Sequence, residues 1–316
     1  MQDQRRSENT AEFTKYLPEV KKYLSELEHQ DLWWTTVAMV GKINNENIDP
    51  QLLVSIVETQ KEFQNLRDTM IQELIGRYLN QANSEIMLKA QAAIDILIRN
   101  LFERTADVGF LATDDDLVEF MARDQVSDED REFIHQRIIE YVAKYTVYDD
   151  VLLLNPQGVV QAKLDTQNPV THSNDPIIAE ALSTNEEYVE VYRHSDLFPN
   201  KPQCHIFAKK IEAEINGQLT TVGVLCLSFN FHEEMDSIYH TLNQGQQGFD
   251  IMLLDQQGRA LSTNTGDKTK IGAKQVEPNG FSKPIRLGDK LHYATKTHGY
   301  QDYYGLPWHG YVQVSN

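Results

Sequence analysis

The chain has 316 residues, of which 41% are hydrophobic and 24% charged, a composition typical of globular proteins with room for two or three domains. Its formal net charge of −18 argues against binding to nucleic acid or to anionic lipid, because both need clustered Lys and Arg side chains. The two cysteines, Cys204 and Cys226, have no CxxC or metal-ligand spacing, so we expect buried free thiols and no metal site.

The N-terminus carries no apolar segment of the kind found in a signal peptide. The longest apolar run near it, Leu32 to Gly41, is about half of the ~20 residues that a membrane span requires. We therefore expect no membrane span and a cytoplasmic protein. The alternative is a soluble sensor piece excised from an extracytoplasmic membrane receptor.

Helical periodicity dominates the first third of the chain. Apolar residues three and four positions apart predict a helix over Ala11 to Leu27, and Asp31 is placed to cap a second helix. Asp49, followed by proline, predicts the start of a long helix that continues to residue 112. The polar stretch Asn80 to Ser84 is its expected weak point. Two shorter helices should follow, capped by Thr113 and Ser127.

A short stretch then occurs twice. D-V-L-L-L-N-P-Q-G begins at Asp150, and D-I-M-L-L-D-Q-Q-G begins at Asp250. An apolar run of strand length, an Asx residue and a glycine predict a buried strand that turns into a hairpin. The repeat therefore predicts two related modules in tandem.

Each module has further elements with clear signals. In the first, Asp175 followed by proline predicts a helix, Tyr188 to Tyr192 a strand, and Asn216-Gly217 a hairpin turn between Cys204–Ile215 and Val222–Phe231. A helix over His232 to Leu242 leads out of it. The second module continues with predicted strands over residues 281–286, 290–297 and 308–314.

These patterns place the chain in the α+β class. N-terminal helices and a long spine helix should precede two tandem PAS-like modules, each with an antiparallel sheet. The expected domains are an N-terminal helical region over residues 1–48, the spine helix over 49–112, and modules over 113–242 and 243–316.

The ends of the two modules carry a family resemblance. The first ends in G-x-L-T-T-V-G-V-L-C-L-S-F-N-F and the second in Y-Y-G-L-P-W-H-G-Y-V-Q-V. Over about Asp49 to Ser315 this resembles the double Cache sensor domain of bacterial chemoreceptors and related signalling proteins. The resemblance implies that the module farther from the output binds a small ligand, that the second relays the signal, and that the long helix pairs with a second copy.

The same resemblance places the ligand between Tyr148 and Phe231. Only the first copy of the repeat is followed by an aromatic and charged run, which supplies a planar cation for a carboxylate, an acceptor for an amine, and rings that exclude water. The expected ligand-binding residues are Tyr192, Arg193, Asp196, Phe198, His205, Phe207 and Ser228.

Simpler interpretations exist for several of these residues. Arg193 and Asp196 could form an ion pair on a surface turn. His205 and Phe207 alternate on one strand and could face away from the pocket, with Ile206 on the core side. Ser228 stands where amino-acid-binding members of the family carry an aspartate, which leaves an organic acid or a purine-like molecule open beside an amino acid.

The sequence thus favours a small-molecule sensing domain that needs no cofactor and has no enzymatic activity, because GxSxG, P-loop, HExxH and GxGxxG motifs are missing. The alternative is a protein-interaction or dimerisation scaffold without a small ligand. A pocket filled by the protein's own side chains would favour that alternative, whereas converging titratable groups with perturbed pKa values would favour an enzyme.

Overall fold

The computed structural model describes residues 18–44, 50–144, 147–243, 248–278, 281–288 and 290–315. The chain divides into two units, the first ending at Ile86 and the second covering Met87–Ser315. The predicted helix start at Ala11 and the predicted cap at Asp49 lie outside the described residues.

The first unit contains helix α2 (Pro18–Asn44) and the first part of helix α3 (Pro50–Ala112). The prediction of a helix break before Asp31 is wrong, because α2 continues through this residue. The Asp31 carboxylate does not cap a helix but accepts hydrogen bonds from three α3 side chains, namely Gln60 (3.2 Å), Gln64 (2.9 and 3.0 Å) and Arg67 (3.3 Å).

The long spine helix is confirmed. α3 has 63 residues and also passes without a break through Asn80–Ser84, where no proline or glycine interrupts the backbone hydrogen bonds. In the second unit, Gly310 lies directly against this helix, since a Cβ there would be 2.0 Å from the Ala90 carbonyl oxygen. Farther along, Asp107 accepts a 2.5 Å hydrogen bond from the Tyr148 hydroxyl. α3 therefore packs against both modules.

The first module begins with two short helices. α4 (Asp115–Met121) is capped by the Asp114 side chain rather than by Thr113, whose hydroxyl instead donates to the Gly109 carbonyl. α5 (Asp128–Val142) has the capping box expected at Ser127, formed with Asp130.

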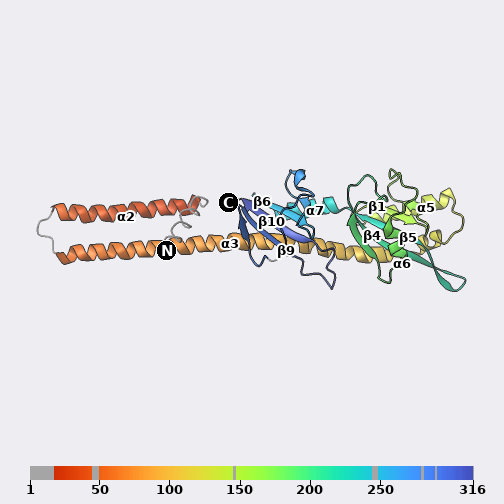
Figure 1. Ribbon diagram of the computed structural model, residues 1–316, viewed down its shortest axis with the longest axis horizontal. Coiled ribbons are helices and arrows are strands. Elements are labelled where there is room, and N and C mark those ends of the chain that lie inside the picture. Colours follow the sequence, from red (N-terminus) through yellow and green to blue (C-terminus); the bar gives the residue numbers. More distant parts are fainter. Residues whose placement is uncertain are drawn as a thin grey trace. The chain divides into compact units, whose positions relative to one another are not determined.

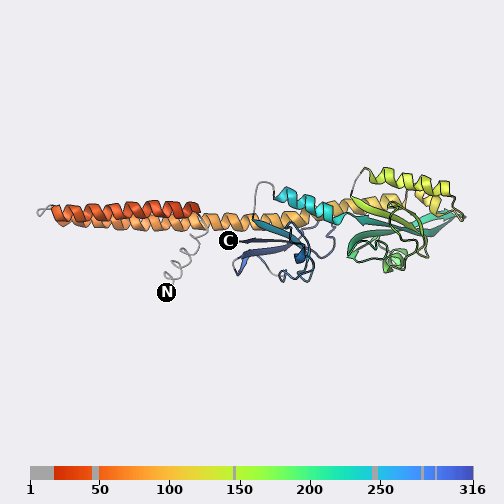
Figure 2. The ribbon, with the colours of Figure 1, turned by 90° about the horizontal axis from the view of Figure 1, so that it is seen from above.

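A five-stranded antiparallel sheet follows, in the order β2-β1-β5-β4-β3. Its strands β1, β4 and β5 are labelled in Figure 1. Its strands are β1 (Tyr148–Leu154), β2 (Val160–Lys163), β3 (Val189–Arg193), β4 (Cys204–Ile215) and β5 (Gln218–Phe229). Helix α6 (Pro176–Ser183) starts at its predicted cap, Asp175. Figure 2 shows the sheet between α5 on one side and α6 on the other.

Helix α7 (Phe231–Leu242) connects this module to a second sheet with the equivalent order, β7-β6-β10-β9-β8. Its strands are β6 (Phe249–Leu254), β7 (Ala260–Thr263), β8 (Ile285–Leu287), β9 (Lys290–Lys296) and β10 (His309–Ser315), with a 3-10 turn, η1 (Lys268–Lys270), after β7. The sequence therefore predicted two antiparallel modules correctly, although β8 is shorter than the strand expected over residues 281–286.

The repeated stretch has the same geometry in both modules. The side chain of Asn155 accepts from the backbone N–H groups of residues 157 and 159, and the side chain of Asp255 accepts from residues 257 and 259. The glycine that closes each turn has a left-handed backbone, with φ of +80° at Gly158 and +79° at Gly258. The two copies are thus equivalent at the level of single hydrogen bonds.

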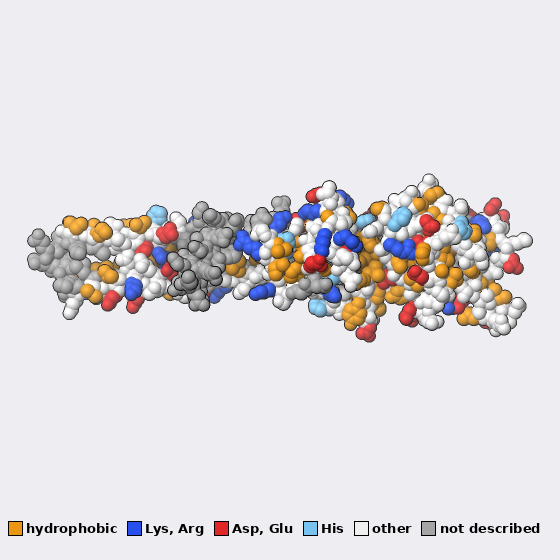
Figure 3. Space-filling model, in the orientation of Figure 1, with side chains coloured by type: hydrophobic (Ala, Val, Ile, Leu, Met, Phe, Trp, Pro, Cys, Tyr) orange, Lys and Arg blue, Asp and Glu red, His pale blue; other side chains and the backbone are white. Residues whose placement is uncertain are grey.

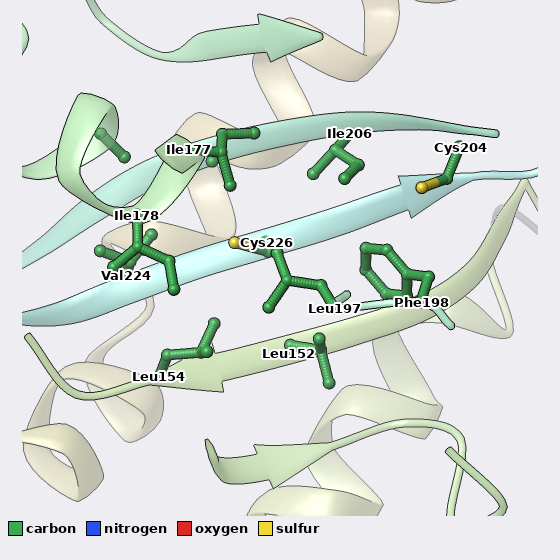
Figure 4. Packing of buried hydrophobic residues seen from close by; sticks show 12 residues of the cluster. Leu152, Leu154, Ile177, Ile178, Leu197, Phe198, Cys204, Ile206, Val224 and Cys226 are labelled. Carbon is green, nitrogen blue, oxygen red and sulfur yellow. The ribbon is translucent and has the colours of Figure 1, made fainter. Parts of the chain in front are cut away.

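The core of the first module lies between the sheet and α6 (Figure 4). It includes both cysteine side chains, Cys204 and Cys226, which are free thiols as predicted. Burial raises the pKa of Cys204 to about 11, so its thiol stays protonated at neutral pH.

Candidate ligand-binding site in the first sheet

The predicted ligand-binding residues lie on two opposite faces of the first sheet. Arg193 pairs with Cys204, and Ser228 pairs with Ile206, so both point toward α6 with the core. Tyr192, His205 and Phe207 occupy the alternate positions and point away from α6. One pocket cannot hold all seven residues.

On the α6 side, Asp175 is the centre of a buried polar cluster. The Arg193 guanidinium donates to both of its carboxylate oxygens, at 2.5 and 2.9 Å, and the Ser195 hydroxyl donates at 2.5 Å. The same carboxylate caps α6 through the Ile177 N–H at 2.9 Å. Burial would raise the pKa of Asp175, but the hydrogen bonds from Arg193 and Ser195 outweigh it and lower this pKa.

The surface-turn interpretation required an ion pair between Arg193 and Asp196, but Asp196 has a different partner. Its carboxylate accepts a 2.5 Å hydrogen bond from the Ser173 hydroxyl on the neighbouring loop. Nearby, the Lys201 ammonium donates to the Ser228 hydroxyl at 3.3 Å and forms an ion pair with Asp149. Polar side chains from β1, from β5 and from the loops that hold Ser173 and Lys201 thus lie close together on this side of the sheet.

The loop after β3 fills the adjoining part of the α6 face. Its residues Leu197 and Phe198 are buried and belong to the same hydrophobic cluster as Ile177 of α6 (Figure 4). The protein's own side chains therefore occupy space between the sheet and α6.

A small cavity of about 40 Å³ opens beside this loop. Its lining is mostly polar and acidic, with Phe198 as the one aromatic side chain. The lining residues are Asp149, Asp150, Asp165, Asn168, Phe198, Pro199, Asn200 and Lys201. A cavity of this size has room for about one water-sized group.

Asp150 was not expected among the site residues. Its buried carboxylate accepts from the backbone N–H of Asp165 at 2.9 Å and from the Asn168 amide at 2.8 Å, while the same amide donates to the Leu197 carbonyl at 2.9 Å. Burial raises the pKa of Asp150. The repeat marked this position in the sequence, but nothing in the sequence indicated that it would connect the hairpin to the loop that holds Leu197.

Among the described residues, no group of three or more His, Cys, Asp and Glu side chains is placed to bind a metal ion. Over the same residues, every helix is too short or too polar to cross a membrane.

Comparisons with known proteins bear on the fold. No protein-family model and no curated protein matches the sequence. A solved domain from Vibrio parahaemolyticus, described as part of a sensory box/GGDEF family protein, superposes with a TM-score of 0.52 at 12% identity, over 73% of this chain and 98% of that domain. The chain has the double Cache fold.

Two further solved structures agree with this assignment of the double Cache fold. The extracellular domain of rpHK1S-Z16, described as a histidine kinase, superposes with a TM-score of 0.51 at 15% identity. The superposition covers 75% of this chain and 96% of that domain. The corresponding domain of vpHK1S-Z8 has a TM-score of 0.50 at 12% identity, with 74% and 93% covered. The two modules of this chain thus have the tandem PAS-like arrangement that the sequence resemblance predicts.

Proposed function

We propose that this chain is the sensory domain of a bacterial signal-transduction protein and that it binds a small polar ligand on the α6 side of the first sheet. The observation that supports this most is the cluster of Asp175, Arg193 and Ser195, in which Asp175 and Ser195 are buried and the Arg193 side chain is 35% exposed. Stability does not require a carboxylate to be buried in an ion pair, because apolar side chains of similar volume usually serve as well. The described roles of the similar solved domains are consistent with sensing.

We infer that four of the seven expected residues, Arg193, Asp196, Phe198 and Ser228, belong to the ligand site. The guanidinium of Arg193 has five N–H donors, of which three bond to Asp175 and to the His194 carbonyl, so two remain to bind a ligand carboxylate. The acidic cavity next to Phe198 is suited to an amine. An amino acid or an organic acid fits this pair of charges better than an uncharged purine-like molecule.

Binding requires the loop over residues 195–202 to move, because Phe198 fills the face and also borders the cavity. The loop-in state and a loop-out state would then exchange. A ligand shifts such an equilibrium only as far as it binds one state more tightly than the other. A loop that leaves the core loses the burial of two large apolar side chains, so the loop-out state is the minor one without ligand.

A thermal-shift screen of amino acids, dicarboxylates and nucleobases tests this site. A ligand at about 100 times its Kd should stabilise the wild type by about 2.7 kcal/mol and so raise its Tm by several degrees. The increase should shrink in Arg193→Lys, because lysine cannot bind a carboxylate through two parallel bonds. It should persist in Glu214→Gln, which changes an exposed residue far along β4.

Two results would contradict direct sensing. One is a screen in which no compound raises the Tm, together with native mass spectrometry that finds no co-purified small molecule. The other is a stabilising compound whose effect is the same in wild type and in Arg193→Lys, which would place its binding site elsewhere.

We further propose that this sensory domain is not an enzyme and that it acts outside the cytoplasm. The extracellular location described for rpHK1S-Z16 and vpHK1S-Z8 supports the second point. Alkaline phosphatase can be fused after Ser315, with the native sequence up to that residue kept intact. The fusion should be active in cells, because this reporter needs an oxidising compartment outside the cytoplasm. An inactive fusion of normal abundance would favour the cytoplasm.

A second candidate function is dimerisation, which one observation in the first unit favours. The α2 segment over residues 32–41 and the α3 segment over residues 50–57 contain no charged residue. Large apolar side chains are nevertheless exposed there, among them Trp33, Met39 and Val57, and hydrophobic surface is visible on this hairpin in Figure 3. Exposed apolar surface of this kind marks interaction sites.

A further inference from the structure

β3 is an edge strand whose residues alternate between two different surroundings. Val189, Val191 and Arg193 face α6, where Arg193 pairs with Asp175. Glu190 and Tyr192 face the other way, because successive side chains of a strand point to opposite faces. A shift of this strand therefore moves both sets together.

The face of β3 that points away from α6 contacts the second module through the carboxylate of Glu190. Glu190 accepts hydrogen bonds from the Tyr303 hydroxyl, at 2.9 Å to each oxygen, and lies 2.7 Å from His205 Nε2. The side chains of Glu190 and His205 are 10% and 0% exposed. Tyr303 belongs to the β9–β10 connection of the second module, so a buried, charge-assisted contact joins the two sheets.

An aromatic contact lies beside it. The ring of Tyr192 is 5.2 Å from Trp308, which directly precedes β10, and 4.9 Å from Phe231, the first residue of α7. Trp308 also lies 5.3 Å from the His205 ring. We call Glu190, Tyr192, His205, Tyr303 and Trp308 the inter-module cluster.

The connection that presents Tyr303 is held in a fixed conformation. Tyr300 and Tyr303 exchange two backbone hydrogen bonds, of 2.8 and 2.9 Å, around Gln301 and Asp302, both of which are left-handed with φ of +48° and +66°. Non-glycine residues adopt this conformation only at an energetic cost, so the contacts around the turn hold it in place. On the α3 side, Asp95 accepts from the His298 N–H at 3.1 Å.

We propose that β3 couples the two modules, so that a change at Arg193 on the α6 face is transmitted through the inter-module cluster to Trp308 and β10. The inference rests on the proposed function, since it gives the ligand site its route to the relay module. It assigns Tyr192 and His205 to coupling rather than to ligand contact.

Hydrogen–deuterium exchange without any ligand tests the coupling. Arg193→Gln perturbs the α6 face, and amide exchange is then compared in β10 and in residues 297–308. We expect exchange there to become roughly 2- to 30-fold faster, the range of coupling carried by packed side chains. Arg193→Lys, which keeps the charge, should give a smaller change in the same direction and covers the case in which the glutamine variant folds poorly.

The decisive comparison repeats Arg193→Gln in a Tyr303→Phe background, where the inter-module hydrogen bonds are missing. The effect of Arg193→Gln on β10 should then shrink, because the route rests on the ring contacts of Tyr192 and His205 with Trp308 once the Tyr303–Glu190 hydrogen bonds are gone. It should persist in full in a Tyr304→Phe background, because Tyr304 is exposed. A β10 that does not respond to Arg193→Gln, or an effect unchanged by Tyr303→Phe, overturns the coupling. Because no ligand is used, either outcome is independent of the ligand screen, and a failed screen with intact coupling would count against ligand sensing alone.

Discussion

Asp175 combines a helix cap and an ion-pair partner in one carboxylate. It satisfies an N–H at the start of α6 and accepts two hydrogen bonds from Arg193. The Asp175 side chain is nearly fully buried, whereas about a third of the Arg193 side chain is exposed, so solvent screening weakens the pair. The larger part of its contribution should come from the hydrogen bonds.

Asp175→Asn should therefore lower the free energy of unfolding by about 1–3 kcal/mol at pH 7. The wild-type contribution also depends on pH. Because the folded-state pKa of Asp175 is below its ordinary value of 3.8, this stability is present above that value and is lost as pH falls through the lower folded pKa. Urea unfolding from pH 7 to pH 3 should show a smaller acid loss in Asp175→Asn. Equal losses in both proteins would contradict this assignment.

The surroundings of Asp175 favour its charged form, whereas those of His309 disfavour the charged form of the imidazole. His309 is 1% exposed, and neither ring nitrogen has a hydrogen-bond partner among the described residues. Burial, helped by Lys296, lowers the pKa of His309 to about 4. Between an unfolded pKa near 6.5 and this value, the unfolded chain binds more protons, so stability should fall as the pH drops from about 6.5 to 4.

His309→Leu should remove this pH dependence, which amounts to about 3 kcal/mol over that range. The variant should be more stable than wild type at pH 4.5, because leucine leaves no unsatisfied buried nitrogen. His240→Leu, a change at an exposed histidine in the last turn of α7, is the matched control and should follow the wild-type curve. The assignment fails if His309→Leu loses stability with acid as steeply as wild type.

At the scale of elements, the repeated turn needs glycine for two reasons. Gly258 has a left-handed backbone, and a Cβ there would lie 1.7 Å from the Val276 carbonyl oxygen. Gly258→Ala should destabilise the protein by about 2 kcal/mol or more. Gly109→Ala offers the contrast, since nothing lies within 4 Å of its Cβ and alanine should stabilise α3 by about 0.5–1 kcal/mol. Thermal unfolding of both variants checks the sign of each change.

Local signals in the sequence were sufficient for most elements. The caps at Ser127 and Asp175, the turn at Asn216-Gly217 and the repeated hairpins depend on interactions within a few residues, and the structure confirms each of them. Asp31 shows the limit of such signals. Its residue type favours a cap, but side chains about thirty residues away provide its hydrogen bonds, and the helix continues.

The candidate site was less predictable for the same physical reason. Alternation along β4 separates His205 from Ile206 but does not say which set faces α6, because both contain apolar residues. The burial of Leu197 and Phe198 depends on a loop packing against strands and a helix that are distant in sequence. The ligand-binding role of the four residues on the α6 face thus stays a prediction, and the other three residues acquire a different proposed role.

At the scale of the whole molecule, the uncharged segments of α2 (residues 32–41) and α3 (residues 50–57) have to be reconciled with a net charge of −18. Two strongly acidic copies repel each other wherever charged surfaces meet, so an interface between copies is least unfavourable where charge is missing. An anionic membrane is a poor occupant, since no Lys or Arg lies within residues 32–41 or 50–57 to attract it. A second copy, forming a four-helix bundle, suits this surface better.

Trp33 and Val40 test this dimer because they line one groove on α2 with Thr36 and Val37, at helical spacings of three, four and seven. A double Trp33→Glu, Val40→Glu variant would bury two carboxylates in an apolar interface and should weaken dimerisation at least about tenfold. Leu219→Glu changes a leucine on the β4–β5 hairpin that is about as exposed as Trp33, and it should leave association unchanged. Sedimentation equilibrium measures all three proteins. A wild type that stays monomeric at every accessible concentration, or a double variant that dimerises as tightly as wild type, would show that another surface or partner uses the hairpin.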